Sequence, residues 1–145
     1  MGPEPLEESY TTEMLHAGLS SSRSPVRSWL LDQRRIAGIG NIYAAEALFI
    51  AEIHPQRPAR DIRLSEAMAL HSSIRKVLHD AIGHGGTTIR DYRNAEGLEG
   101  QYAPQLHVYG REGEACPRCD ARIEKVVFSN RSAFYCPTCQ PVQGQ

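Results

Sequence analysis

Two pairs of cysteines near the end of the chain constrain its fold more than any other feature. Each pair has the form C-x-x-C, sixteen residues (120–135) separate the pairs, and the chain contains only four cysteines. This spacing is typical of a four-thiolate zinc site, because a hairpin between the pairs can complete a tetrahedron of ligands. We therefore predict one structural Zn²⁺ held by Cys116, Cys119, Cys136 and Cys139.

The zinc site leads to a prediction about stability. A finger of about thirty residues buries too little apolar surface to fold alone, whereas metal binding can supply on the order of 10 kcal/mol. We expect zinc removal to unfold the C-terminal part and to leave the rest of the chain folded.

The net charge of the chain is close to zero, but basic residues cluster in two places. The formal net charge is −1, so affinity for nucleic acid must come from local basic patches. One patch contains Arg23, Arg27, Arg34 and Arg35 against Asp32, and a second contains Arg118, Arg122, Lys125 and Arg131 against Asp120 and Glu124. Such clusters are often only a solvated face, and this alternative stays open.

No apolar run approaches the roughly 20 residues that span a bilayer, and no secretory leader is expected, so we expect a cytoplasmic protein with no membrane partner.

Capping signals predict two helices in the first part of the chain. Thr11 or Thr12 is expected to cap a short helix that ends near Leu19. Ser24 is expected to cap a second helix, with Pro25 in its first position. One face of this second helix is marked by Val26, Trp29, Leu30 and Gln33.

Periodicity predicts two further helices and a β-containing end. A helix is expected over 42–50 and a longer one over 65–83. The apolar face of the longer helix is formed by Met68, Ile74, Val77, Leu78, Ala81 and Ile82. Residues 87–102 form a polar connector, and short strands are expected around the cysteines from Leu106 onward.

These elements predict a mainly α fold, in which a helical domain precedes a small β-hairpin zinc finger. The expected organisation is a linker and short helix (1–23), a helical domain (24–106) with the connector 87–102, a four-cysteine finger (107–140) and a tail (141–145).

A glycine-bearing turn joins the second and third expected helices, with the sequence Gly38-Ile-Gly-Asn41. Gly38 and Gly40 lack a Cβ, so an oxygen-rich ligand can approach their amides, and the helix that follows would direct free N–H groups outward. Such a turn suits a phosphate. Asn41 could bind that phosphate through its side-chain amide, cap the helix, or do both. A turn that needs glycine only for tight packing is the alternative.

Several longer segments resemble a known protein family. They are Leu30–Phe49, Ile53-His-Pro55, Gly85–Tyr92, Val108–Gly113 and Arg131–Cys136. In sequence and order they resemble the C-terminal half of the formamidopyrimidine-DNA glycosylase and endonuclease VIII family, and they come closer to the formamidopyrimidine branch. The resemblance implies a helix–two-turn–helix domain and a zinc finger that together grip the backbone of damaged DNA.

The resemblance also implies roles for single residues. Asn41 matches the phosphate-binding asparagine of the turn, Arg131 matches the phosphate-binding arginine of the finger, and the four cysteines match the zinc ligands. The predicted DNA-binding set is Gly38, Gly40, Asn41, Arg131 and Arg35, the last from the basic patch beside the turn. The connector matches the loop that covers an everted oxidised purine in some members, and its candidate residues are Thr88, Arg90, Asp91 and Tyr92.

The resemblance does not include the family's catalytic groups. Members act through the amine of an N-terminal proline, with a glutamate and a lysine, on an N-terminal domain that we expect this chain to lack. Its only lysines, Lys76 and Lys125, are expected to be exposed charges. We therefore assign no catalytic residue and expect no base excision by the chain alone.

A few other residues are assigned structural roles. Glu46 is expected to accept hydrogen bonds from the amides of the glycine turn. Trp29 and Tyr43 are expected in the core, and Phe134 and Tyr135 are expected to pack the finger.

Three functions remain open. The first is the DNA-binding half of a base-excision-repair glycosylase and AP lyase of the formamidopyrimidine or 8-oxoguanine type, inactive alone. The second is the active enzyme, formed when a separate N-terminal catalytic domain is supplied by another chain or restored to a truncated sequence. The third is a zinc ribbon that binds protein. Under the first two, the partner is double-stranded DNA in a bacterial cytosol or nucleoid.

Overall fold

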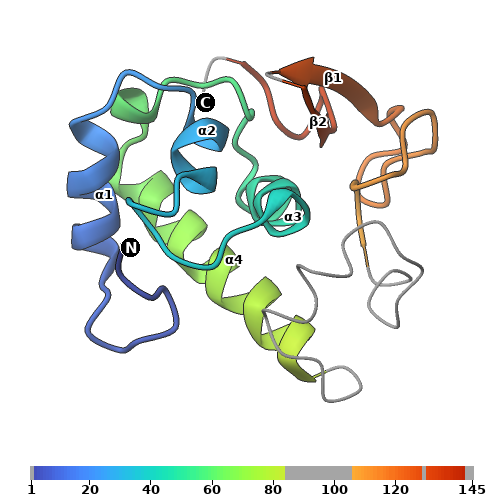
Figure 1. Ribbon diagram of the computed structural model, residues 1–145. Helices are drawn as coiled ribbons and strands as arrows, with labels where there is room; N and C mark the ends of the chain where they lie inside the picture. Colours follow the sequence, from blue (N-terminus) through green and yellow to red (C-terminus); the bar gives the residue numbers. More distant parts are fainter. Residues whose placement is uncertain (1, 84–105, 129, 143–145) are drawn as a thin grey trace.

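The computed structural model describes residues 2–83, 106–128 and 130–142. In chain order, the elements are α1 (Thr12–Ser20), α2 (Val26–Leu31), α3 (Asn41–Ala51), the 3₁₀ helix η1 (Ala59–Asp61), α4 (Leu64–Gly83), β1 (Glu124–Phe128) and β2 (Arg131–Tyr135). The helices form the body of the molecule, and the two strands form a hairpin on the opposite side of α3 from α1 (Figure 1). The predicted class, mainly α with a small β-hairpin, is confirmed. None of the described helices is long and apolar enough to cross a membrane.

The first two helices begin in different ways. α1 begins as predicted, because the Thr11 hydroxyl accepts a hydrogen bond from the Met14 amide at 3.2 Å. The predicted Ser24 cap of α2 is wrong, since this helix begins at Val26 with Pro25 at the N-cap and no side-chain cap. The Val26 amide donates instead to the carbonyl oxygen of Arg57 at 2.7 Å. A backbone partner distant in sequence therefore replaces the expected hydroxyl.

α3 is the central helix, and its residues from Asn41 to Phe49 are all buried. It packs against α2 and α4 on the helical side and against β2 on the other side (Figure 1). A helix enclosed in this way must be apolar around most of its circumference, which explains its richness in alanine and aliphatic residues. Trp29 and Tyr43 are 3 % and 1 % exposed and belong to the helical core, which confirms their predicted packing role.

The long helix α4 has the predicted length, but one member of its predicted apolar face is wrong. Met68 is 60 % exposed. The buried face instead includes Ala67 and Leu70 and continues through Ile74 and Val77. Residues three and four apart share a helix face, so Ala67 at the first turn lies on the same buried face as Leu70 and Ile74.

Arg57 ties the start of α4 to the preceding loop. Its guanidinium donates two hydrogen bonds to the Glu66 carboxylate, at 2.6 and 2.8 Å, and one to the carbonyl oxygen of Asp61 at 2.9 Å. Glu66 also accepts from the Arg63 amide at 2.9 Å, as in a capping box. Burial alone would raise the pKa of Glu66, but the hydrogen bonds from Arg57 and Arg63 lower it to about 2.

The hairpin pairs β1 and β2 in antiparallel register, from Glu124 opposite Tyr135 to Phe128 opposite Arg131. Asn130, in the turn, has φ = 68°, a left-handed conformation that asparagine tolerates well. Among the described residues, these are the only strands, so the predicted strand character begins at Glu124 and not near Leu106.

Candidate functional site

The four cysteines meet at one place, although they come from two separate knuckles. Their Sγ atoms all lie within 4.8 Å of one another. The Cys119–Cys136 and Cys116–Cys139 distances are 3.4 and 3.9 Å. Sulfurs that bind one tetrahedral Zn²⁺ at the usual bond length lie about 3.8 Å apart. The cluster thus has the size and the soft thiolate donors that one structural zinc ion requires.

Backbone amides close each knuckle around its first cysteine. The Arg118 amide donates to Cys116 Sγ at 3.3 Å, and the Cys139 amide donates to Cys136 Sγ at 3.4 Å. Asp120 has φ = 70°, and its amide donates to the carbonyl oxygen of Cys116 at 2.9 Å. Hydrogen bonds to sulfur stabilise the thiolate, which is the form that binds metal.

The finger shares a hydrophobic core with α3. Phe49 is 1 % exposed, and it packs in one cluster with Ala45, Val108, Cys116, Ile123, Phe134 and Cys136. The guanidinium of Arg118 lies 4.6 Å from the centre of the Phe49 ring and pairs with Glu52 at 3.0 Å. Phe134 therefore packs the finger as predicted, and it does so against the helical domain.

Gln140 adds a buried polar link next to this core. It is fully buried; its Oε1 accepts from the Cys136 amide at 2.8 Å, and its Nε2 donates to the carbonyl oxygen of Ile53 at 2.9 Å. One side chain thus joins the second knuckle to the segment after α3. Sequence reasoning missed this residue, because nothing near Gln140 in the chain indicates its distant partner.

The glycine turn has a defined internal structure. Gly38 has φ = 84°, which a residue with a Cβ rarely adopts. Its amide donates to Gln33 Oε1 at 2.8 Å, and Gln33 Nε2 donates to the carbonyl oxygen of Ile39 at 3.0 Å. The prediction that the Gly38 amide faces a ligand is therefore wrong. Gly40 is the N-cap of α3 and leaves the first amides of that helix without a side-chain cap.

Asn41 is the first residue of α3, and its side chain reaches the finger. Asn41 Nδ2 donates to the carbonyl oxygen of Ser132 at 2.9 Å, and Oδ1 accepts from Arg27 Nη2 at 2.6 Å. Arg27 Nη2 also lies 3.3 Å from the same Ser132 oxygen. The capping role considered for Asn41 is thus absent, and the residue joins the helical turn to β2 beside Arg131.

Arg27 completes this junction, although the sequence analysis placed it only in a basic patch and not among the DNA-binding residues. It is 4 % exposed, its Nε is buried without a hydrogen-bond partner, and its guanidinium lies 5.9 Å from the centre of the Phe128 ring. Burial lowers the pKa of Arg27, and the positive charge of Arg131 lowers it further. Within the described residues, neither arginine pairs with a carboxylate. Among the residues that the structure describes, the junction therefore holds two guanidinium groups without a counterion.

Arg35 lies next to the turn but has an acidic neighbour. Its Nε is 3.5 Å from Asp32, and its side chain is 40 % exposed. Asp32 also pairs with Arg34 at 3.0 Å, and the hydrogen bonds from Arg34 lower the pKa of Asp32 to about 2. Arg35 is accessible to a ligand, although Asp32 offsets part of its charge.

The remaining sequence assignments have mixed outcomes. The structure places Glu46 away from the turn, because its carboxylate accepts from the amides of His107, Val108 and Tyr109; the predicted partners are wrong. Lys76 and Lys125 are exposed as predicted, in ion pairs with other side chains. The candidate lesion-loop residues Thr88, Arg90, Asp91 and Tyr92 lie outside the described residues, so their role stays a prediction.

A helical domain with a glycine-bearing turn, and a four-cysteine hairpin finger packed on the helix after that turn, define a helix–two-turn–helix protein with a zinc finger. The family model for the formamidopyrimidine-DNA glycosylase H2TH domain matches residues 1–93, and the zinc finger found in FPG and IleRS matches residues 113–142. The chain belongs to the formamidopyrimidine-DNA glycosylase family of DNA-repair enzymes.

Individual relatives agree with this assignment. The chain is 48 % identical to the formamidopyrimidine-DNA glycosylase of Chloroflexus aggregans, over 96 % of this chain and 50 % of that protein. It is 49 % identical to the same-named protein of a Roseiflexus species, over 96 % of this chain and 51 % of that protein. The chain thus spans about half the length of the curated relatives it matches.

Solved structures show the same fold. The MutM (Fpg) protein of Thermus thermophilus superposes with a TM-score of 0.86 and 43 % identity, over 99 % of this chain and 55 % of that one. Lactococcus lactis Fpg, in a complex with DNA that contains an abasic site, superposes with a TM-score of 0.84 and 36 % identity, over 97 % of this chain and 52 % of that one.

Proposed function

We propose that this chain binds duplex DNA by its phosphates and is the DNA-binding half of a base-excision-repair glycosylase and AP lyase of the formamidopyrimidine or 8-oxoguanine type. The observation that carries the proposal is the junction of Arg27, Asn41 and Arg131, where the helical turn meets the finger. The complex of the Lactococcus lactis protein with abasic-site DNA supports it.

The junction has the chemistry of a phosphate site. Two guanidinium groups without a described counterion favour an anion, and arginine matches phosphate geometry well. Asn41 Nδ2 carries two hydrogens, and the Ser132 carbonyl uses one, so the other can be donated to a phosphate oxygen. The uncapped amides at the start of α3 add partial positive charge.

The proposal is tested by measuring duplex affinity at several salt concentrations, by fluorescence anisotropy with the zinc-loaded chain. Each lost phosphate contact of a charged side chain should reduce the magnitude of the slope of log K against log salt by about 0.9, and the loss of a neutral contact should lower the affinity alone. The double variant Asn41→Ala, Arg131→Ala should bind weakly and with a shallower slope. Arg60→Ala is the matched control, because Arg60 is exposed on η1, which packs against α1. Unchanged binding by the double variant would refute the proposal.

We further propose that the chain alone is inactive: it does not excise bases, and it does not form a Schiff base with an abasic sugar. A Schiff base with an abasic sugar requires an unprotonated amine. Lys76 pairs with Asp80 at 2.9 Å, and Lys125 lies 3.9 Å from Glu112, so both ammonium groups have acidic neighbours that favour the charged form. Borohydride trapping on a duplex with one abasic site should yield bound but uncrosslinked DNA. A covalent adduct with the chain alone would contradict this part of the proposal.

The second candidate function is an active enzyme completed by a separate N-terminal domain. The curated relatives extend beyond the half that this chain matches, and that other half is the domain to supply. Mixing the chain with the N-terminal half of the Chloroflexus aggregans protein should then restore a borohydride-trapped adduct. No adduct from a mixture in which both halves are folded would count against completion in trans.

A further inference from the structure

Glu46 is a buried acid that the proposed DNA site does not use. It is 1 % exposed, and both of its oxygens are occupied. Oε1 accepts from the amide and from Nδ1 of His107, each at 2.8 Å. Oε2 accepts from the amides of Val108 and Tyr109 at 2.9 and 3.0 Å. Four donors thus converge on one carboxylate, and three of them are successive backbone amides.

Successive amides that point to one place form an anion-binding nest, and here the anion is part of the protein. Hydrogen bonds to an ionised acceptor are roughly twice as strong as neutral ones. They compensate for the burial of a charge that would otherwise be costly. Because the carboxylate is enclosed, Glu46 cannot contact DNA, and any effect of this residue on DNA binding must be indirect.

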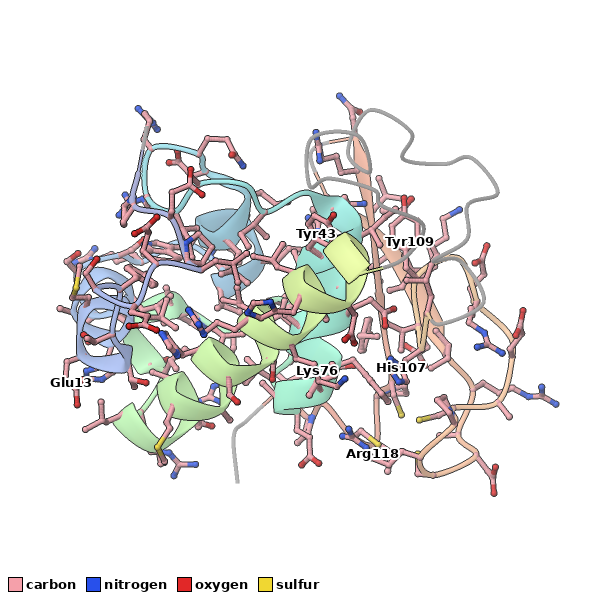
Figure 2. The ribbon with its side chains drawn as sticks, turned by 90° about the horizontal axis from the view of Figure 1, so that it is seen from below. Glu13, Tyr43, Lys76, His107, Tyr109 and Arg118 are labelled. Carbon is pink, nitrogen blue, oxygen red and sulfur yellow. The ribbon has the colours of Figure 1, made fainter. Side chains whose placement is uncertain are left out.

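The nest lies where the finger begins. Figure 2 shows His107 and Tyr109 on the finger side of α3. Val108 is fully buried in the core that Phe49 shares with the finger. The Tyr109 ring meets Phe134 of β2 edge to face, with 4.8 Å between ring centres. Phe134 lies three residues after Arg131 on the same strand, so the backbone of β2 connects this ring contact to the arginine of the phosphate site.

We propose that Glu46 is a positioning residue, which fixes the start of the finger on α3 so that Arg131 lies at the helical turn. The inference rests on the proposed DNA-binding function. Glu46 and Asn41 lie on the same helix, so one rigid element holds the turn at its start and the finger about one and a half turns later. Without the carboxylate, the three amides lose their common acceptor and the finger can shift relative to α3.

Glu46→Gln is the principal variant, because it keeps the shape of the side chain and replaces one acceptor oxygen with a donor. Amide exchange by NMR should show faster exchange at Val108 and Tyr109, with zinc content and helical circular dichroism unchanged. Duplex affinity should fall about tenfold, the size of coupling expected between residues in one contact network. Glu52→Gln is the matched control: Glu52, the C-cap of α3, also pairs with the finger, but its side chain is 59 % exposed.

A double-mutant cycle with Arg131→Ala separates positioning from a general loss of stability. If Glu46 acts through the finger arginine, adding Glu46→Gln to the Arg131→Ala variant should lower its duplex affinity by less than twofold. His107→Ala is a second, milder variant, because it removes one donor and leaves the three amides in place; it should weaken binding less than Glu46→Gln. If the Glu46→Gln variant does not retain zinc, the duplex affinity of His107→Ala tests the positioning role in its place.

The outcomes are distinct. A wild-type chain that does not bind duplex DNA refutes the proposed function and, with it, this inference. Wild-type binding that Glu46→Gln and His107→Ala leave unchanged refutes the inference alone. Full additivity of Glu46→Gln with Arg131→Ala also overturns it, because the two residues would then act independently.

Discussion

The core that α3 shares with the finger makes the stability of the helical part depend on zinc. Phe49 is covered by finger residues that include Val108 and Phe134. Chelation of zinc should unfold the finger, because its folding free energy comes largely from the metal. Phe49 would then face water on a helix that the separate helical core still holds.

The size of the effect follows from the burial of one side chain. Full burial of a phenylalanine contributes about 1.5–3 kcal/mol, and the helical part would lose this contribution with the finger. Each 1 kcal/mol shifts the Tm of a domain of this size by about 4–8 °C, so the Tm should fall by about 6–24 °C. Most of the helical circular dichroism should remain at room temperature.

The assay compares unfolding with zinc and with a chelator for two variants on the same helix. Phe49→Ala should cost about 3–5 kcal/mol with zinc and almost nothing without it, because Phe49 is then already exposed. Leu48→Ala is the control: Leu48 is equally buried but faces the helical core, so its cost of about 2–5 kcal/mol should persist in both states. An equal cost of Phe49→Ala in both states would refute the reasoning.

Three further predictions concern the helical part. Arg57→Met leaves the Glu66 carboxylate without its bidentate partner and should lower the free energy of unfolding in urea by about 3 kcal/mol. The pKa of Glu66 is held at about 2, below its ordinary 4.5, so its contribution to stability is complete above pH 4.5 and is lost as the pH falls toward 2; the urea midpoint should drop over this window in the wild type and less in Glu66→Gln. Gly18→Ala would place a Cβ 2.7 Å from a ring carbon of Trp29, so it should lower the Tm despite the better helix propensity of alanine, by an overpacking cost of about 1–3 kcal/mol.

Features with local causes could be predicted from the sequence. The spacing of the cysteines identifies the zinc site, because two tight knuckles and a hairpin depend on neighbouring residues. The Thr11 cap was equally predictable, since its acceptor and donor are three residues apart. The long periodic stretch of α4 gave its extent to within one residue.

Features that depend on distant partners could not be predicted. The donors to Glu46 lie 61 to 63 residues along the chain, and the contact of Arg27 with Ser132 spans 105. The sequence around each of these residues is compatible with an ordinary surface charge. Only the packing of the finger on α3 makes Glu46 a buried acceptor and Arg27 a buried cation. The start of α2 also depends on a distant partner, because the Val26 amide donates to the carbonyl oxygen of Arg57 and not to a side-chain cap.

The near-neutral net charge is compatible with a phosphate site, because the acids near the junction are already engaged. Glu46 is enclosed by amides, and Asp32 is paired with Arg34 and Arg35. One acid of the N-terminal part lies far from the finger: Figure 2 places Glu13 of α1 at the opposite side of the molecule from Tyr109. The positive charges of the junction therefore act locally, at distances shorter than the roughly 10 Å over which salt screens charges. A chain can carry as many acids as bases and still present an attractive surface to DNA, provided that folding separates the two.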